Sequence, residues 1–508
     1  MPHDILAEIT ARRRAVIKEQ GVSFGFAVPE TRRRPVVPFM PVPGAILEIK
    51  RASPSKGMIA PDLDAVKTAE AYVNAGAEGI SVLTETDYFH GSLADLTAVA
   101  GAAGTHASIL RKDFLLEADE VNVAYLCGAD AVLLIARILD ADNLCVMARR
   151  AFSLGIAVLL EIREEKDCEK AYEVIKLAHN MGCEQQLVLG INARDLATFS
   201  VDPLMPVRIR RRMSVYCAVQ KEHIKLPPVI AESGIMTEEA ASFAGFMSFG
   251  GVLIGEAAAR NPGKAHELVQ AFTDASDAVS QRTIETKFWE TIADRLEYCE
   301  GKRPLVKICG ITNTSDAHAA ADAGADFLGF VFSEGSRRCV DCTTVERIRS
   351  SFQKNRCPAF IGVITETDSG KGREAMHLAQ NGILDGIQYH GCQPSAGVPG
   401  YAAVRVQSEA DVEHMKNLLE TGQYRVLMDA FMYGLPGGTG TRIPEIFVQK
   451  AASLPHLWLA GGITPDNVHN IVEKFHPELV DVSSGVESVP GIKDHKKIDR
   501  LFTAVKCL

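Results

Sequence analysis

The stretch AILEIKRASPSKG, residues 45–57, starts as an apolar strand and breaks at Ser-Pro-Ser. It contains two charged residues, Glu48 and Lys50, which stand two positions apart. Alternate residues of a strand point to the same face, so both side chains face the same way. Because burying charge is costly unless the charges are paired, this pattern predicts that the strand ends at a polar site.

Short apolar runs of the same kind recur through the N-terminal half, separated by Ala-rich stretches with helical character. Near-continuous apolar strands that alternate with helices indicate a parallel sheet covered on both faces. Eight such units in about 210 residues match a (β/α)₈ barrel, or TIM barrel. The eight runs are AILEIK (45–50), GISVLT (79–84), SILRKD (108–113), AVLLIAR (131–137), IAVLLEI (156–162), LVLGIN (187–192), PVIAESG (228–234) and GVLIGE (251–256).

A second set of eight runs follows Pro304. A doubly wound open sheet would also contain parallel strands, but two separate sets of eight favour two tandem barrels of the α/β class. The runs are LVKICG (305–310), FLGFVF (327–332), AFIGVIT (359–365), GIQYHG (386–391), AAVRV (402–406), RVLMDA (425–430), LWLAGG (457–462) and LVDVSSG (479–485).

These runs predict three regions. Residues 1–272 would form the first barrel with an N-terminal amphipathic helix, in which Ile5, Ile9 and Val16 recur at helical spacing. That helix either lies across the mouth of the barrel or caps its bottom. Residues 273–302 are predicted to be a helical linker or interdomain brace, and residues 303–508 the second barrel.

The composition predicts a soluble, cytoplasmic, multidomain enzyme. The 508 residues are 47% apolar and 23% charged, and the net charge of −10 disfavours nucleic-acid binding. No apolar run reaches the roughly 20 residues that span a bilayer, and the N-terminus does not look like a signal peptide. The basic clusters at 32–34 and 210–212 are expected to be solvated faces. Of the 12 cysteines, only Cys339 and Cys342 (CVDC) have the spacing of a metal-binding pair, and no second pair follows. We therefore expect reduced thiols and no metal site.

The carboxyl ends of the strands hold the active site in this fold. In the first barrel, six of the eight runs end in these polar side chains, which are Glu48, Lys50, Lys112, Asp113, Arg137, Glu161, Asn192, Glu232 and Ser233. Acids and lysines that converge there would shift one another's pKa values, as acid–base catalysis requires. Gly234 and Gly255 end the last two strands, where such barrels bind phosphate. The pattern predicts an enzyme that acts on a small phosphorylated molecule.

The motifs ILEIKRASPSKG, ILRKDF, LLEI, GINARDL, IAESGI and VLIGE resemble those of indole-3-glycerol-phosphate synthases, one motif per strand over residues 1–272. The resemblance implies closure of an indole ring from a phosphorylated carboxyphenylamino-deoxyribulose, with loss of carbon dioxide and water. It implies that Lys112 is the general acid and that Glu161 and Lys50 serve later proton transfers. Lys50 would also lie near the substrate carboxylate, with Glu48 pairing with the lysines.

The same resemblance implies two groups of binding residues. Asn192, Arg194, Glu232 and Ser233 would bind and position the substrate. Ser53, Gly234, Gly255 and Glu256 would hold its phosphate, with Glu256 contributing its backbone N–H. One departure from the family pattern is Ala193, where many relatives have a second asparagine.

In the second barrel, strand 1 ends in Cys309-Gly310 and strand 6 in Asp429. A lone buried cysteine is usually a small core residue, but a cysteine and a carboxylate at two strand ends can form an acid–base couple. The glycine-rich loop 434–441 lacks GK[ST] and is predicted to be a mobile lid. The predicted phosphate corner consists of Gly461, Gly462, Ser484 and Gly485.

The motifs KICGIT, SRRCV, IQYHG, VLMDA, GGTGT, LAGGITPDN and SSGVESVPGIKD resemble phosphoribosylanthranilate isomerases over residues 303–508. The resemblance implies an Amadori rearrangement that makes the aminoketose used by the first barrel. Asp429 would be the acid that opens the ribose ring, and Cys309 the base that removes the proton from C2. Arg338 would bind the anthranilate carboxylate, with Gln388 and His390 lining the pocket, although His390 could equally be a core histidine.

Together the two resemblances imply a bifunctional enzyme of tryptophan biosynthesis that needs no cofactor or metal. Its partners would be small phosphorylated anthranilate-sugar substrates, with no nucleic acid and no membrane. A rival hypothesis is a Schiff-base aldolase that uses Lys50 or Lys112 as nucleophile. Another is a sugar-phosphate-binding scaffold whose catalytic sites have decayed, which the presence of Lys112, Glu161, Cys309 and Asp429 disfavours.

Overall fold

The chain forms two compact units, Met1–Gln281 and Arg282–Leu508. A computed structural model describes residues 5–195, 200–278, 284–299, 302–353, 357–395, 397–429, 449–451, 453–454 and 456–506. The predicted lid at 434–441 lies outside the described residues.

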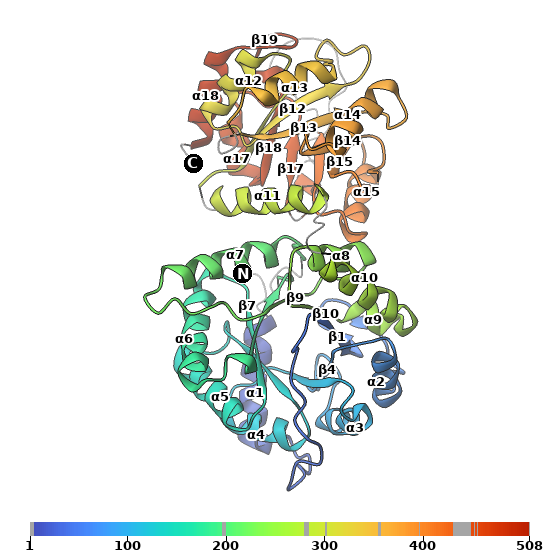
Figure 1. The fold of residues 1–508 in the computed structure, drawn as a ribbon, viewed down its shortest axis with the longest axis vertical. Helices are drawn as coiled ribbons and strands as arrows, with labels where there is room; N and C mark the ends of the chain where they lie inside the picture. Colours follow the sequence, from blue (N-terminus) through green and yellow to red (C-terminus); the bar gives the residue numbers. More distant parts are fainter. Residues whose placement is uncertain are drawn as a thin grey trace. The chain divides into compact units, whose positions relative to one another are not determined.

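The first unit contains a closed barrel of eight parallel strands, as predicted. Strand β10 pairs with β1 and closes the ring, with Gly44 in register with Gly251. In Figure 1 these strands lie inside a layer of helices. The strands are β1 (Gly44–Ile49), β4 (Gly79–Leu83), β5 (Ser108–Lys112), β6 (Ala131–Ile135), β7 (Ala157–Ile162), β8 (Leu187–Asn192), β9 (Val229–Glu232) and β10 (Gly251–Ile254).

The helices of this unit fall where the chain leaves each strand. Several begin at a side chain that accepts hydrogen bonds from the first turn, as N-caps do, namely Asp64, Ser92, Asp140 and Thr237. The helices are α1 (Ile5–Gln20), α2 (Ala65–Asn74), α3 (Leu93–Ala103), α4 (Ala118–Leu126), α5 (Ala141–Ser153), α6 (Glu165–Met181), α7 (Met205–Val219), α8 (Glu238–Phe246), α9 (Glu256–Arg260) and α10 (Ala265–Asp277). A small hairpin, β2 (Ala52–Ser53) with β3 (Gly57–Met58), follows β1.

Helix α1 lies at the mouth of the first barrel, which decides between the two positions left open by the sequence. Its Leu6 and Ile9 line the same pocket as Glu48. Its Arg13 pairs with Asp113, the residue after β5, at 2.7 Å. The mouth is therefore partly covered by a helix that precedes the barrel in sequence.

The expectation that residues 32–34 form a solvated face is wrong for two of the three arginines. The side chains of Arg32 and Arg34 are only 5% and 9% exposed, and their guanidinium groups lie 2.6 and 3.1 Å from the carboxylate of Asp130. Asp130 directly precedes β6, and Arg32 also donates to the carbonyl of Ala129. These arginines fix the segment before β1 to the amino end of the barrel.

The second unit repeats the closed eight-stranded parallel barrel, so the predicted fold class is confirmed for both units. Strand β18 pairs with β11 to close the ring, with Lys307 in register with Asp481. The strands are β11 (Leu305–Cys309), β12 (Phe327–Phe332), β13 (Ala359–Ile364), β14 (Gly386–His390), β15 (Gly400–Arg405), β16 (Val426–Asp429), β17 (Trp458–Ala460) and β18 (Leu479–Val482).

The described helices of the second unit are α11 (Ile284–Cys299), α12 (Thr314–Ala323), α13 (Cys342–Ser350), α14 (Gly370–Gln380), α15 (Glu409–Glu420), α17 (Val468–Phe475) and α18 (His495–Lys506). A hairpin of β19 (Glu487–Val489) and β20 (Ile492–Lys493) precedes α18.

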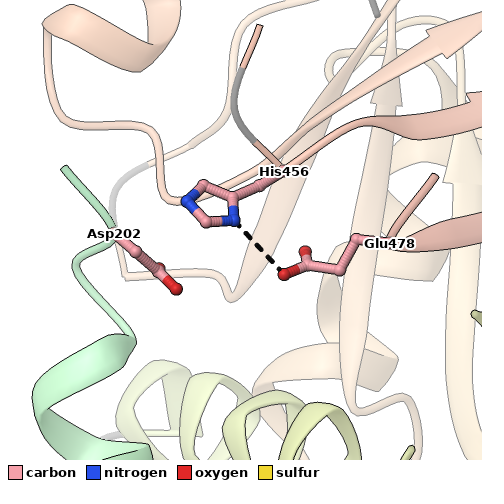
Figure 2. A group of neighbouring side chains, drawn as sticks. All are labelled: Asp202, His456 and Glu478. Carbon is pink, nitrogen blue, oxygen red and sulfur yellow. Dashed lines mark ion pairs between the residues drawn. The ribbon is translucent and has the colours of Figure 1, made fainter. Parts of the chain in front are cut away.

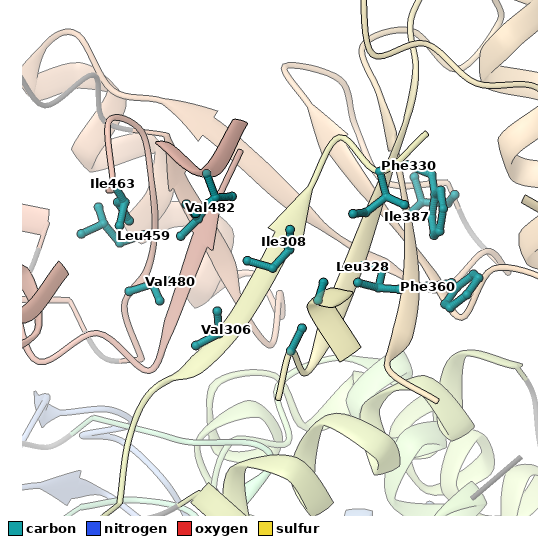
Figure 3. Close-up of a cluster of buried hydrophobic side chains, with 14 of the residues drawn as sticks. Val306, Ile308, Leu328, Phe330, Phe360, Ile387, Leu459, Ile463, Val480 and Val482 are labelled. Atoms are coloured by element: carbon teal, nitrogen blue, oxygen red, sulfur yellow. The ribbon is translucent and has the colours of Figure 1, made fainter. Parts of the chain in front are cut away.

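In the strands of the second barrel, successive side chains point alternately outward to the helices and inward to the barrel axis. Ile308, Leu328 and Phe330 are fully buried and belong to the apolar cluster shown in Figure 3, which also includes helical residues such as Val345. These side chains therefore fill the space between strands and helices. Lys307 and Cys309 flank Ile308 in sequence and point the opposite way, into the barrel.

Helix α11 packs on the second barrel. Trp289 is 1% exposed, and its ring centroid lies 4.9 Å from that of Tyr424, the residue two before β16. The ring of Phe288 stacks on Tyr401 near the start of β15, and Arg295 donates to the carbonyl of Cys357 at 3.0 Å. The helix thus covers the amino ends of the strands, whereas α10 packs in the first unit against α8. The limits 273–302 for a linker stay a prediction.

A cluster of charged and polar side chains around Glu478 lies at the amino end of the second barrel. Figure 2 shows His456 beside Glu478, with Nδ1 3.4 Å from the carboxylate. Arg425 lies 2.6 Å from the same carboxylate, and Trp458 Nε1 donates to it at 2.8 Å. Burial acts to raise the pKa of Glu478, but Arg425 and His456 outweigh it, so the pKa is low and the group is ionised.

None of the described helices is both long and apolar enough to cross a bilayer.

Candidate active sites

A single pocket at the carboxyl ends of the first barrel's strands contains every predicted site residue of that barrel. These are Glu48, Lys50, Ser53, Lys112, Glu161, Asn192, Arg194, Glu232, Ser233, Gly234, Gly255 and Glu256. Apolar side chains complete the wall, including Leu6 and Ile9 of α1 together with Phe89, Phe114 and Leu133. The pocket therefore combines a charged floor with an apolar side that fits an aromatic ring.

Lys112 lies at the centre of the charged floor. Its Nζ is 3.3 Å from Glu232 and 3.6 Å from Glu161. Burial alone would lower the pKa of Lys112, but Glu232, Glu161 and Glu48 reverse this effect and raise it above its ordinary value. The ammonium is therefore a charged proton donor at neutral pH.

Glu48 and Lys50 form the second ion pair of the floor, with Nζ 3.1 Å from Oε1. Burial acts to raise the pKa of Glu48, but Lys50 and Lys112 outweigh it and hold the pKa below its usual value. The ammonium of Lys50 also lies 5.5 Å from the ring centroid of Phe89, within cation–π range. This arrangement explains why β1 ends in two charges on one face.

Glu232 carries the least satisfied carboxylate of the pocket. It is 1% exposed, and its Oε1 has no hydrogen-bond partner among the described residues. Burial raises the pKa of Glu232 to about 7, although Lys112 opposes the rise. The carboxylate occupies space left by Gly190, where a Cβ would lie 1.9 Å from Oε1. Gly190 was not identified from the sequence, because only the packing shows why a glycine is needed there.

The predicted phosphate corner brings together the ends of β9 and β10. Ser233 and Gly234 both have positive φ, 69° and 79°. Glycine adopts this conformation freely, but for Ser233 it is strained, and such strain is common at functional sites. The side chain of Glu256 is directed to two arginines, Arg260 at 3.0 Å and Arg194 at 4.0 Å. It therefore does not present an unpaired negative charge to an incoming phosphate.

A buried charge network anchors α1 beside this pocket. Arg13 contacts Asp113 at 2.7 Å and Glu120 at 2.8 Å, and Arg111 contacts Asp113 at 3.1 Å. The side chains of all four are at most 7% exposed. Asp113 follows Lys112 directly, so the network connects the helix to the strand that carries Lys112. The sequence placed Asp113 at a strand end, but it gave no sign that Arg13 is its partner.

In the second barrel, Cys309 and Asp429 end β11 and β16, as expected. Cys309 is 8% exposed. The charge of Asp481 on β18 acts to raise the pKa of Cys309, and the charge of Asp429 acts to raise the pKa of Asp481. Burial raises the pKa of the Cys309 thiol, and Lys307 opposes the rise.

Asp429 lies in hydrogen-bonding contact with His390. His390 Nε2 lies 3.0 Å from Oδ2, and Arg405 lies 3.7 Å away. Burial acts to raise the pKa of Asp429, but His390 and Arg405 outweigh it and lower the pKa. His390 is therefore a partner of the predicted acid. Of the two alternatives left open, this contact disfavours a purely structural histidine.

The two remaining predicted binding residues of this barrel both have partners. Arg338 makes two bonds to the carboxylate of Glu487, at 2.8 and 2.7 Å. The Oε1 atom of Gln388 accepts from Lys307 at 2.6 Å and from Tyr401 at 3.2 Å. A substrate carboxylate bound to Arg338 would therefore have to share it with Glu487. The Oε1 atom of Gln388 is already hydrogen-bonded to two side chains inside the barrel.

The predicted phosphate residues of the second barrel lie on two adjacent loops. Gly461 and Gly462 both have positive φ, 102° and 65°, directly after β17. Gly485 follows β18, and a Cβ on it would lie 1.9 Å from the carbonyl oxygen of Ile463. The close approach of the two loops depends on Gly485.

The sequence matches two family descriptions. Residues 11–270 match "Indole-3-glycerol phosphate synthase", and residues 306–504 match "N-(5'phosphoribosyl)anthranilate (PRA) isomerase". These matches confirm both resemblances seen in the motifs.

Related proteins are similar to this chain over nearly its whole length. A "Tryptophan biosynthesis protein TrpCF" of Vibrio parahaemolyticus is 30% identical, covering 91% of this chain and 84% of its own. A "Multifunctional tryptophan biosynthesis protein" of Phanerodontia chrysosporium is 30% identical over 92% of this chain, which spans 63% of that relative's length. The phosphoribosyl anthranilate isomerase structure from Thermotoga maritima is 31% identical, covering 40% of this chain and all of its own, with a TM-score of 0.35. The chain therefore belongs to the indole-3-glycerol phosphate synthase family over residues 11–270 and to the phosphoribosylanthranilate isomerase family over residues 306–504.

Proposed function

We propose that the chain catalyses two consecutive steps of tryptophan biosynthesis. The second barrel would isomerise N-(5-phosphoribosyl)anthranilate to 1-(2-carboxyphenylamino)-1-deoxyribulose 5-phosphate. The first barrel would convert that product to indole-3-glycerol phosphate with loss of carbon dioxide and water. The observation that carries the proposal is the charged Lys112 held between Glu161 and Glu232 in a pocket with one apolar wall.

In the first barrel, the apolar wall would hold the anthranilate ring, and Lys112 would protonate the ketone oxygen as the ring carbon attacks. Carbon dioxide then leaves and the electron pair of the broken bond restores the conjugated system. Loss of the hydroxyl as water needs a proton donor and a base. Glu161 and Lys50 are the groups in the pocket suited to these transfers.

In the second barrel, the His390–Asp429 pair would donate a proton to the ribose ring oxygen. Because the pKa of Asp429 is lowered, the proton would reside on the pair and not on Asp429 alone. Cys309 would then remove the proton from C2, and the resulting enol would become the ketone.

The geometry disfavours a Schiff-base aldolase. A lysine nucleophile must lose its proton before it attacks a carbonyl, whereas the carboxylates around Lys112 raise its pKa. Sodium borohydride added during turnover tests this alternative, because it traps a Schiff base as a stable adduct. The proposal predicts no adduct.

Two substitutions test the assignment of one reaction to each barrel. Lys112→Met should abolish indole formation while isomerisation continues, and Asp429→Asn should do the reverse. Isomerisation is measured by the loss of phosphoribosylanthranilate fluorescence, and indole formation by absorbance from the purified aminoketose. Loss of both activities in a variant that remains folded would contradict the two-site assignment.

The proposal includes the cytoplasm as the site of both reactions. The described cysteines are free thiols, which fits a reducing compartment.

A further inference from the structure

Lys307 is a buried cation inside the second barrel. It begins the KICGIT motif, but neither the resemblance nor the proposed mechanism assigns it a role. It lies on β11, two residues before Cys309, so both side chains point into the barrel. Its side chain is 0% exposed. A fully buried lysine is rare, and a buried ion pair usually adds little net stability. Its presence directly below the strand end therefore calls for another explanation.

Two strands hold the ammonium of Lys307 in place. Nζ lies 2.6 Å from Asp481 Oδ2 on β18 and 2.6 Å from Gln388 Oε1 on β14. Tyr401 on β15 donates to the same oxygen of Gln388 at 3.2 Å. An ammonium has three donors, so these two bonds leave one N–H for a further neighbour.

The Cys309 thiol lies beside this ammonium, and both the thiol and the Tyr401 hydroxyl are within reach of the remaining N–H. Gly329 lies opposite Cys309 in the register of β11 and β12. A Cβ placed on Gly329 would be 2.7 Å from Cys309 Sγ and 3.0 Å from Lys307 Cε. Because Gly329 has no side chain, the sulfur of Cys309 and the side chain of Lys307 both lie in the space beside it. Burial raises the pKa of the thiol, and the charge and hydrogen bonding of Lys307 are the strongest influence against that rise.

The other charged or titratable groups that act on Cys309 do not replace Lys307. They are Asp481 on β18, Lys493 on β20, Arg338 in the loop after β12 and Tyr401 on β15. Lys493 donates to the carbonyls of Cys309 and Ser483 at 2.6 and 3.2 Å and pairs with Glu487 at 3.0 Å. These contacts use all its donors, and its contact with Cys309 is to the main chain.

We propose that Lys307 is a positioning residue of the isomerase reaction: its ammonium, fixed by Asp481 and Gln388, orients the Cys309 thiolate and stabilises its charge. The inference rests on the proposed role of Cys309 as base. When the thiolate removes the C2 proton, an S–H bond forms and the electron pair of the C–H bond stays with the substrate. Lys307 keeps its own proton throughout and acts only through the sulfur.

The test is the pH dependence of isomerase kcat/KM in Lys307→Met. An opposite charge at this range shifts a pKa by about 1–3 units, so the acid limb should move up by about 2 pH units and kcat/KM at neutral pH should fall about 100-fold. Asp481→Asn removes a negative charge near the sulfur, so it should move the acid limb the other way, to lower pH. Synthase activity of the same preparation measures the amount of intact enzyme, and thermal unfolding reports the fold of the second unit.

A second pair of variants covers the risk that Lys307→Met alone destabilises the barrel. Lys307→Met/Asp481→Asn removes both charges and should still shift the acid limb upward, by less than the single change. The matched control is Arg425→Met/Glu478→Gln, which deletes another ion pair, at the amino end of the same barrel. It should lower stability and leave the pH profile unchanged.

The outcomes separate this inference from the proposed function. Cys309→Ala should abolish isomerisation, and if it does not, the assignment of Cys309 as base is wrong. If Cys309→Ala is inactive but folded Lys307→Met, alone or in the double variant, keeps the wild-type pH profile, the role of Lys307 is overturned. A shift of the control profile as large as that of the Lys307 variants would overturn it too.

Discussion

Gly190→Ala is the substitution that most directly probes how the first barrel holds the carboxylates beside Lys112. The new Cβ would lie 1.9 Å from Glu232 Oε1, whereas nonbonded heavy atoms pack best at about 3.5 Å. The carboxylate must therefore move by roughly 1.5 Å. Lys112 is 3.3 Å from Glu232, so a displacement of this size can break their contact.

The expected effect is on catalysis more than on folding. A misplacement of about 1 Å can cost about 100-fold in rate, so we expect synthase kcat to fall by that factor. The assay is indole absorbance from the aminoketose, with isomerase activity of the same chain as internal reference. The matched control is Gly101→Ala, a helical glycine whose Cβ would meet nothing within 4 Å. It should leave both activities unchanged.

Two results would refute this reasoning. A folded Gly190→Ala enzyme with wild-type synthase kcat would show that Glu232 need not stay where it lies. An equal loss in Gly101→Ala would show that the effect is not local to the pocket.

Three further predictions concern the same barrels. In Gly329→Ala the new Cβ would lie 2.7 Å from the Cys309 sulfur and should displace it. Isomerase kcat should then fall by about 100-fold while synthase activity stays intact, and a wild-type isomerase kcat would contradict this. Arg13→Met leaves the buried Asp113 with one cation fewer and should lower the free energy of unfolding, measured by urea denaturation, by about 3 kcal/mol. A change near zero would show that the network does not anchor α1. Burial raises the pKa of Glu232 to about 7, so its contribution to stability is full below its unfolded pKa of about 4.3 and is lost as pH rises through 7. Glu232→Gln should therefore make the free energy of unfolding depend less on pH between these values. An unchanged slope would count against the raised pKa.

The sequence could predict those parts of the site that depend on local periodicity. The strands were identifiable because each is a short apolar run, and the alternation of side chains placed Glu48 and Lys50 on one face. The barrel then brought Lys112, Glu161 and Glu232 together, because the carboxyl ends of all its strands meet at one mouth.

Features that depend on distant partners could not be predicted in the same way. Arg32 was expected at a solvated face because its partner, Asp130, is 98 residues away. The sequence predicts that residues 273–302 form a helical linker or interdomain brace, but nothing near α11 in sequence shows that Phe288 stacks on Tyr401. Lys307 stood inside an ordinary strand motif, and its partner Asp481 is 174 residues further on.

The most direct test of the central claim is to supply the purified wild-type chain with phosphoribosylanthranilate as its only substrate. We predict that the substrate fluorescence decays first and that indole absorbance then rises to the same molar amount, with the aminoketose as the intermediate. Fluorescence that does not decay, or decay without any indole from a folded enzyme, would contradict the account.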